Sequence, residues 1–459
     1  MFSLAGSSRT LNTYCQRIAS KLYEIPLCWK IMSNRPEQPS AHPYRDGHRT
    51  SHWDVLVGSV LCVLALVVTA LYGWRIGWFA SMTGNDAAAS SATADAARNT
   101  PQQLARSATP KPDLSPAGKA RRMVNAMDMD TRIGQLVMAP LYAGNDPASL
   151  ASLIADRHVG SVLIIGKWTG GVASVRAAAD QLQGYAPGDN RLIISTDQEG
   201  GWVQHLIGPG FDRMPTAVDQ GTMSTDQLRQ SASVWGSQLA AAGINVDLAP
   251  VLGTVVANRA ANAPIGALYR DFGLDAAGNA AQGTAFVQGM ADAGVQSAIK
   301  HYPGLGAVTG NTDFTADGIL DTTTTLDGAE IKAFDTTIDQ ADPAMVMMAL
   351  ATYQAIDPND PAVFSSIIID GHLRGDLGYD GAVISDSMSA AAVSAYDTTQ
   401  LGVKLVEAGG DLACIGDTNY VAPILDGLST RAASDPAFAN EVTQSAIHVM
   451  TLKIKMGLA

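Results

Sequence analysis

Short apolar runs recur along the chain and alternate with longer, alanine-rich stretches of helical composition. The runs are rich in Val, Ile, Leu and Met, as expected for strands that are buried on both faces of a parallel sheet. Helices are expected at 226–242 and 276–292, and Gly243 and Gly294 follow them as stop signals. Eight strands in this alternation predict an α/β protein with a (β/α)8 TIM-like barrel: 135–141, 160–165, 192–195, 246–248, 297–300, 345–350, 382–385 and 411–415.

A longer apolar stretch, residues 55–74, precedes these runs and contains no charged residue. About 20 apolar residues span the core of a bilayer, so we expect one transmembrane helix here, with a buried core helix or the core of a cleaved signal peptide as the alternatives. Arg35, Arg45 and Arg49 precede the stretch, and the positive-inside rule therefore places the N-terminus in the cytoplasm. Residues 1–31 are unlike a usual anchor, and Met32 is the start that we expect.

The transmembrane span and the predicted strands divide the chain into four segments, of which the barrel domain is the last. A stretch rich in Ala, Ser, Thr and Pro separates the span from the first predicted strand and is typical of a flexible linker. The expected segments are a cytoplasmic N-terminal segment (1–54), the transmembrane helix (55–74), an extracytoplasmic linker (75–115) and the barrel domain (116–459). The expected location is therefore the cell membrane, with the barrel domain outside.

Composition narrows the choice of partners. The hydrophobic share of 47% allows a large core, and the formal net charge of -13 argues against a nucleic-acid partner, because phosphate binding needs a basic face. Cys414 is the only one of the four cysteines in the part expected outside, so that part has no disulfide. Cysteine and histidine residues do not occur at metal-ligand spacing, and we expect neither a metal nor a cofactor.

Polar side chains come directly after several of the predicted strands. Asp386 follows 382–385, Asp197 follows 192–195, and Lys300 and His301 lie at the end of 297–300. The carboxyl ends of barrel strands meet at one open face, where such groups suit a polar, uncharged substrate such as a sugar. A carboxylate there can attack an anomeric carbon, although an aspartate after a strand also often caps a helix.

Other polar residues suit sugar binding at the same face. The carboxylate of Asp197 can accept hydrogen bonds from sugar hydroxyls, and Lys300 and His301 can donate to hydroxyls or to an acetamido oxygen. Arg270 lies in a loop after 246–248 and, taken alone, would be a surface arginine. The glycine-rich segment 304–310 lacks the spacing of a phosphate-binding loop, so its glycines are expected to make a loop over the site mobile.

Seven stretches of the chain resemble glycoside hydrolase family 3, in its single-domain branch of bacterial β-N-acetylglucosaminidases. The resemblance implies a retaining mechanism with Asp386 as the nucleophile. It also implies that Asp197, Arg270, Lys300 and His301 bind the sugar in the minus-one subsite. The stretches occur in the family's order: IGQLVMAPL (133–141), STDQEGGWVQ (195–204), NVDLAPVL (245–252), IGALYRDFG (265–273), IKHYPGLG (299–306), LRGDLGYDGAVISDSM (373–388) and AGGDLACIG (408–416).

The chain departs from the family pattern at three places. Asp313 stands where the branch carries its acid/base histidine, and Asn311 stands where the branch has a supporting aspartate. Trp202 and His205 replace two arginines, so His205 is expected to take the place of a sugar-contacting cation. Leu305 replaces a frequent histidine. A carboxylic acid can protonate a leaving oxygen if its pKa is raised, and we therefore expect Asp313 to be the second catalytic residue.

Together these features predict a membrane-anchored, extracytoplasmic β-N-acetylhexosaminidase that acts on cell-wall glycan or its peptidoglycan-derived fragments. Two alternatives stay open: a β-glucosidase-type enzyme of the same family, and a catalytically weak relative that binds cell-wall glycan. An ionised Asp313 would repel phosphate in the second step, so hydrolysis or transglycosylation is expected rather than phosphorolysis.

Overall fold

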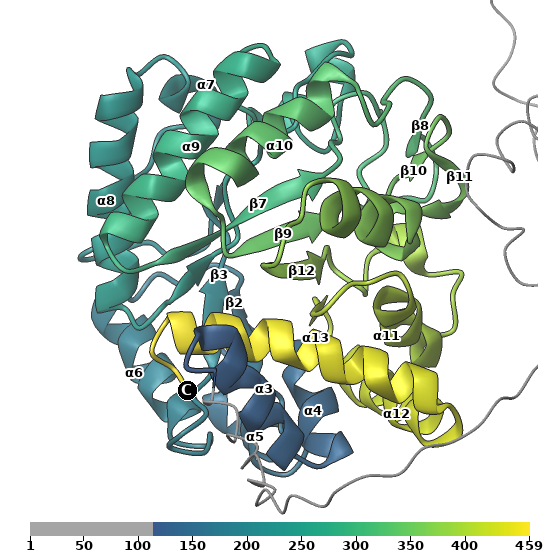
Figure 1. Cartoon of the computed structure of the whole chain (residues 1–459). Coiled ribbons are helices and arrows are strands. Elements are labelled where there is room, and N and C mark those ends of the chain that lie inside the picture. The colour runs from purple at the N-terminus through teal and green to yellow at the C-terminus, as the bar shows by residue number, and fades with distance from the viewer. Residues whose placement is uncertain (1–112) are drawn as a thin grey trace, which may run out of the picture. The chain divides into compact units, whose positions relative to one another are not determined.

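Eight parallel strands form a barrel that helices surround (Figure 1). The computed structural model describes residues 113–459. The strand order is β12-β9-β7-β6-β3-β2-β1-β13, and a bridge between Ile384 and Leu412 joins the two ends of the sheet. The predicted α/β barrel is confirmed. Its strands are β1 (Val137–Tyr142), β2 (Ser161–Ile165), β3 (Ile193–Thr196), β6 (Val246–Asp247), β7 (Gln296–Tyr302), β9 (Met345–Met348), β12 (Ala382–Ser385) and β13 (Ala413–Cys414).

Each predicted strand has an observed counterpart, but some boundaries differ. β7 extends beyond the predicted end at Lys300, because Tyr302 still pairs with Met348 of β9. β9 and β13 are shorter than the predicted runs 345–350 and 411–415. Apolar composition therefore located these strands, whereas their ends depend on the pairing with neighbouring strands.

Helices cover the outside of the barrel, and their starts follow local capping signals. Ser224 caps α8 in a capping box with Gln227, and the Asp275 side chain accepts a hydrogen bond from Gly278 N at the start of α9. The helices are α3 (Pro116–Ala126), α4 (Met129–Gln135), α5 (Ala151–Ala155), α6 (Gly171–Gln183), α7 (Ala217–Gln220), α8 (Thr225–Ala241), α9 (Ala276–Asp292), α10 (Ala329–Ala341), α11 (Thr398–Glu407), α12 (Val421–Ser434) and α13 (Pro436–Lys455).

Shorter elements lie in the loops between strands and helices. They include the antiparallel pair β4 (Gln198–Gly200) and β5 (Val203–Gln204) and a small sheet of β8 (Leu320–Asp321), β10 (Thr352–Tyr353) and β11 (Asp357–Pro361). Single turns are η1 (Pro147–Leu150), η2 (Arg259–Ala261), η3 (Gly266–Leu268), η4 (Ala362–Phe364), η6 (Ala391–Val393) and η7 (Thr418–Tyr420), and η5 (Ile367–Asp376) is a π-helix.

Side chains alternate between the inside of the barrel and the layer under the helices. Ala382 and Ile384 of β12 belong to the inner apolar cluster, whereas Val383 packs in the outer one. Because the period along a strand is two, the next inward position is Asp386. On β7, Ala298 also points inward, and the next inward position two residues later is Lys300. The barrel geometry thus aims these polar side chains at the carboxyl end of its interior.

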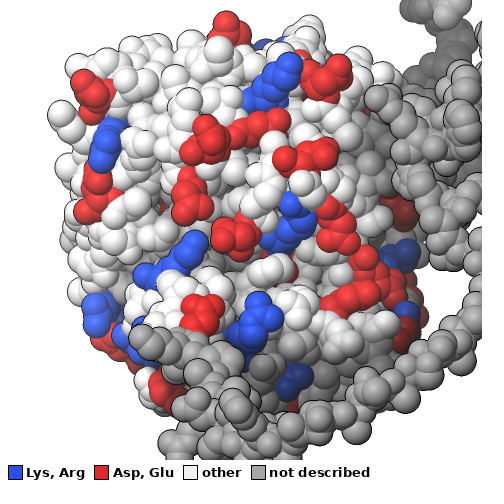
Figure 2. All heavy atoms as spheres, viewed as in Figure 1, with Lys and Arg blue, Asp and Glu red and all other residues white. Residues whose placement is uncertain are grey.

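The described part carries charges of both signs on its surface. The face in Figure 2 shows acidic and basic side chains interspersed rather than gathered by sign. Among residues 113–459, no helix is both long and apolar enough to cross a membrane. The predicted cytoplasmic segment, the transmembrane helix at 55–74 and the linker up to residue 112 lie outside the described residues.

Candidate active site

A cavity of about 470 Å³ opens at the carboxyl ends of the strands. This volume lies in the range of small-molecule sites. Apolar side chains from the barrel interior, such as Leu163, Leu248 and Met347, form part of its wall. The structure brings all the sequence-predicted site residues together here: Asp197, His205, Arg270, Lys300, His301, Asp313 and Asp386.

Two cations in the site are held by two carboxylates. Lys300 Nζ contacts Asp197 Oδ1 and lies 2.7 Å from Glu199 Oε1. Arg270 makes a bidentate pair with Glu199, with distances of 2.9 Å from Nε and 2.7 Å from an Nη atom. The Arg270 side chain is only 13% exposed, so the alternative of a surface arginine is wrong.

The charges of this cluster stabilise each other against burial. Burial alone would raise the pKa of Glu199, but Arg270 and Lys300 hold it below its usual value. Burial likewise opposes the charge of Lys300, but Asp197 and Glu199 raise its pKa above the usual value. The cluster therefore keeps fixed charges in the physiological pH range, and its donors are pre-positioned.

Glu199 received no role from the sequence, although it belongs to the quoted STDQEGGWVQ stretch. It lies behind the cavity wall, 4% exposed, where it orients Arg270 and Lys300. The only feature of the sequence that could have indicated a role for Glu199 is its position two residues after Asp197, beside the paired glycines. That signal did not point to its partner, because Arg270 lies 71 residues away.

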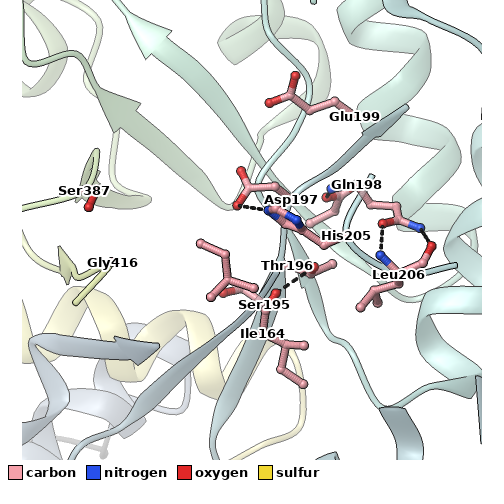
Figure 3. Close-up of polar contacts among 12 residues, drawn as sticks. Ile164, Ser195, Thr196, Asp197, Gln198, Glu199, His205, Leu206, Ser387 and Gly416 are labelled. Carbon is pink, nitrogen blue, oxygen red and sulfur yellow. Dashed lines mark hydrogen bonds and ion pairs between the residues drawn. The ribbon is translucent and has the colours of Figure 1, made fainter. Parts of the chain in front are cut away.

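Asp197 and His205 face each other across the start of the β4–β5 pair (Figure 3). The closest approach is 3.9 Å, from His205 Nε2 to Asp197 Oδ2. The Gln198 side chain holds this segment by bonding the backbone N and O of Leu206, at 3.0 and 2.9 Å. His205 thus lies in the cavity wall as expected, with an imidazole where the family pattern has an arginine.

Asp386 extends from the end of β12 into the cavity. Its Oδ1 accepts a hydrogen bond from Ser387 N at 2.8 Å, and its Oδ2 lies 3.9 Å from His301 Nε2. Burial, together with Arg270 and Lys300, lowers the pKa of His301 well below its usual value, so this imidazole is neutral. No helix of the described part takes Asp386 as its N-cap, so the capping alternative is wrong.

Asp313 reaches the cavity from the long loop between β7 and β8. Backbone N–H groups of Ala391 and Ala392 donate to the carbonyl oxygens of Asp313 and Thr312, at 3.2 and 3.0 Å. Asn311 does not contact the Asp313 carboxylate. Its side chain accepts from Asp313 N at 3.0 Å and shapes the turn. Asp313 is thus held in place by its backbone, and its side chain lies in the cavity wall with one part exposed to solvent.

The Asp313 and Asp386 carboxyl groups both have raised pKa values. Burial, with a contribution from the neighbouring Asp313, raises the pKa of Asp386 to about 7. Shielding by the cavity walls raises the pKa of Asp313, against an opposing effect of Arg270. Neither carboxylate has a Lys or Arg within ion-pair distance among the described residues. The pair as a whole therefore retains one proton up to about pH 7, as acid catalysis requires.

The glycines of the 304–310 loop allow close backbone packing. A side chain at Gly306 would meet Thr254 O at 1.7 Å, and one at Gly310 would meet Asp317 O at 2.0 Å. The Asn262 side chain also donates to Leu305 O and Val308 O, both at 2.7 Å. The base of the loop is thus fixed by packing, and the expected mobility of the loop stays a prediction.

Comparisons with known proteins agree with this geometry. Residues 128–452 match the model of the glycosyl hydrolase family 3 N-terminal domain. The chain is 31% identical over 319 residues to "Beta-hexosaminidase LpqI" of Mycobacterium tuberculosis (strain ATCC 25618 / H37Rv), covering 67% of this chain and 79% of that protein.

Solved structures give the same assignment. The crystal structure of a β-N-acetylhexosaminidase from Beutenbergia cavernae DSM 12333 superposes with a TM-score of 0.69 at 40% identity, covering 72% of this chain and 99% of that one. A family 3 β-N-acetylglucosaminidase from Paenibacillus sp. str. FPU-7 gives 0.65 at 30% identity, covering 72% and 63%. Because the family model spans more than half of the chain and the relatives match across the barrel, the protein belongs to glycoside hydrolase family 3.

Proposed function

We propose that this protein is a retaining β-N-acetylhexosaminidase. The observation that carries the proposal is the Asp386 carboxylate, which lies in the cavity beside a fixed set of sugar-binding groups and has no Lys or Arg partner among residues 113–459. The family relatives described as hexosaminidases support the choice of sugar. Family 3 also supports the coarser statement that the enzyme is a glycosidase.

The reaction proceeds in two steps that use both carboxyl groups. Asp386 attacks the anomeric carbon while Asp313 protonates the leaving oxygen, and the glycosidic bond breaks to give a covalent glycosyl-enzyme. In the second step the ionised Asp313 takes a proton from water, and the resulting hydroxide displaces Asp386. Retaining enzymes need about 5–5.5 Å between the two carboxyl groups.

The remaining residues hold the sugar. Lys300 and Arg270 donate to its hydroxyl and acetamido oxygens, and Asp197 accepts hydrogen bonds from its hydroxyls. His301 is neutral, so its ring provides one donor and one acceptor at the nucleophile. His205 adds a further ring nitrogen beside Asp197. Since these groups are set by the buried ion pairs, the sugar binds in one orientation.

The first experiment tests the nucleophile. 4-Nitrophenyl β-N-acetylglucosaminide and the matching β-glucoside are incubated with the wild type and with Asp386→Asn. The proposal is supported if the wild type turns over the N-acetylglucosaminide and Asp386→Asn abolishes this turnover. If the wild type prefers the glucoside, the β-glucosidase alternative is favoured. Asp317→Asn is the control, because it makes the same chemical change at an exposed aspartate outside the cavity, in the loop between β7 and β8.

Asp313→Asn tests the acid. With a sugar leaving group, which needs protonation, we expect kcat/KM to fall by about 10²–10⁴-fold. The fall should be smaller with 4-nitrophenol, which leaves without help. Equal losses on both substrates would contradict the acid role. A wild type that binds glycan and turns over none of these substrates would favour the cell-wall-binding alternative.

We propose water or a sugar hydroxyl, rather than phosphate, as the acceptor. The ionised Asp313 repels a phosphate dianion at the moment of attack, and the cations of the site are already paired with Asp197 and Glu199. Release of the bound glycosyl group is therefore expected to proceed at the same rate with and without phosphate. Faster release in phosphate would contradict the proposal.

We further propose that the enzyme is anchored in the cell membrane by residues 55–74 and works outside on cell-wall glycan or its fragments. The support is the uncharged apolar sequence of this stretch and the arginines before it. Membrane fractionation of expressing cells, followed by protease treatment of intact spheroplasts, tests this. A protein that stays in the soluble fraction, or a barrel domain protected from the protease, would contradict it.

A further inference from the structure

Four aromatic side chains of the described part are exposed, and each belongs to the cavity lining or is the chain neighbour of a lining residue. They are Tyr142, Trp202, Tyr269 and Phe314, with exposed fractions of 41, 76, 48 and 82%. Tyr142 and Phe314 line the cavity, Trp202 precedes the lining residue Val203, and Tyr269 lies between the lining residues Leu268 and Arg270. Exposed apolar groups that cluster at a cavity mouth usually mark a binding surface.

Tyr142 and Phe314 lie next to the proposed acid. Phe314 follows Asp313 in the chain, and both line the cavity. Tyr142 is fixed from the other side, because its hydroxyl donates to Gly416 O at 2.8 Å. Burial raises the pKa of Tyr142, and the negative charges of Asp417 and Asp313 add to this effect.

Polar and aromatic groups occupy different depths of the cavity. Lys300 and His301 are 1% and 4% exposed, whereas Phe314 is almost fully open to solvent. The deep polar groups match the hydroxyl-rich edge of one sugar. Outer aromatic rings match the flat C–H face of another sugar ring, since the π-face is negative and the C–H groups are positive. The leaving group must lie beside the acid, and Phe314 and Tyr142 line the same cavity as Asp313.

We propose that Phe314 and Tyr142, with Trp202 farther out, bind the leaving-group sugars, so that the preferred substrate is an oligosaccharide chain rather than a single sugar on a small aglycone. This inference rests on the proposed function and adds the aglycone class to it. The occupant is a carbohydrate rather than a protein surface, because the aromatic groups continue directly from the sugar-sized cavity.

The test compares substrates with and without a leaving-group ring. One substrate is N-acetylglucosaminyl β-azide, which has no ring in its leaving group, and the other is the β-1,4-linked tetrasaccharide of N-acetylglucosamine. Phe314→Ala is expected to lower the ratio of kcat/KM for the tetrasaccharide to that for the azide by about two- to tenfold. Phe314→Tyr should keep the wild-type ratio. Val234→Ala, an exposed apolar residue on α8, is the control.

An unchanged ratio in Phe314→Ala and in Trp202→Ala would overturn the inference. If the wild type cleaves neither the azide nor the tetrasaccharide, the proposed function is contradicted, but the inference about the aromatic residues can still be tested by measuring tetrasaccharide binding. Titration calorimetry with the tetrasaccharide then supports it if binding is weaker in Phe314→Ala than in the wild type. Absence of binding to the wild type, or equal affinities, would overturn it.

Discussion

Glu199 shows how one buried residue determines the geometry of the site. It contacts both Arg270 and Lys300; the Glu199 and Lys300 side chains are buried, and that of Arg270 is mostly buried. A buried charge without a partner is costly, so each of the three depends on the others. The positions of the sugar-binding donors on Arg270 and Lys300 therefore depend on the position of the Glu199 carboxylate.

Replacement of Glu199 by Gln is expected to destabilise the fold and weaken substrate binding. The change leaves Arg270 with one carboxylate fewer in a buried setting, which costs about 3–5 kcal/mol. Urea unfolding measures the stability, and KM for the aryl glycoside measures the binding. Asp292→Asn is the control, because it breaks an exposed pair with Arg229. Equal losses in the two variants would show that burial does not matter here.

The two raised carboxyl groups predict an activity optimum on the acidic side of neutrality. Burial and Asp313 raise the pKa of Asp386 to about 7, so the pair retains one proton up to about that pH. Above it both groups ionise and the acid is lost, which makes kcat/KM fall. In Asp313→Asn this alkaline limb should be absent with 4-nitrophenyl substrates. If kcat/KM of the variant still falls at alkaline pH, a group other than Asp313 is responsible for that fall.

At the scale of elements, the loop that carries Asp313 is positioned by its neighbours. Its base is tied to Asn262, whose amide donates to two carbonyl groups of the loop and whose oxygen accepts from Gly266 N at 2.6 Å. Its tip is tied to η6 through the backbone of Ala391 and Ala392. A catalytic group on a loop can therefore be held almost as well as one on a strand.

Loss of the Asn262 amide should loosen this loop. Asn262→Ala leaves buried carbonyl groups unpaired, and we expect a stability loss of about 1–3 kcal/mol together with a lower kcat. Thermal unfolding and kcat with an oligosaccharide substrate measure the two effects. Asn258→Ala, which changes an exposed cap of η2 nearby, is the control. An unchanged kcat would show that the loop does not need this anchor.

For the whole molecule, α13 brings a lysine to the interior. Lys453 is fully buried, and its Nζ donates to Gln135 Oε1 and Asn190 Oδ1 at 2.7 and 2.9 Å. Burial lowers its pKa to about 7. Between pH 7 and the usual pKa of lysine, Lys453 binds a proton in the unfolded chain but not in the folded one. The free energy of unfolding therefore decreases as the pH falls toward 7.

Lys453→Met should remove this dependence. The stability of the wild type relative to the variant is expected to rise by about 1–3 kcal/mol between pH 7.5 and 9.5, as measured by urea unfolding. Lys455→Met, two residues away and exposed, should show no such change. A relative stability that is flat with pH would contradict a depressed lysine pKa.

The sequence predicted much of this protein because the relevant signals are local. Runs of apolar residues located all eight strands, and the positions at the ends of two of these runs indicated Asp386 and Lys300. The family motifs added Arg270, which its neighbours in the chain would have left on the surface. The proposed site residues could thus be selected before the structure was known.

Only the tertiary structure decided how these residues interact. Lys300 contacts Asp197 across 103 residues, and Arg270 contacts Glu199 across 71, so neither pair has a local signature. Packing against residues 391 and 392 places Asp313 beside the cavity, and Tyr142 at the end of β1 lines the same cavity as Phe314 of the loop between β7 and β8. Charge, burial and pKa depend on neighbours in space, and neighbours in space are set by the closure of the barrel.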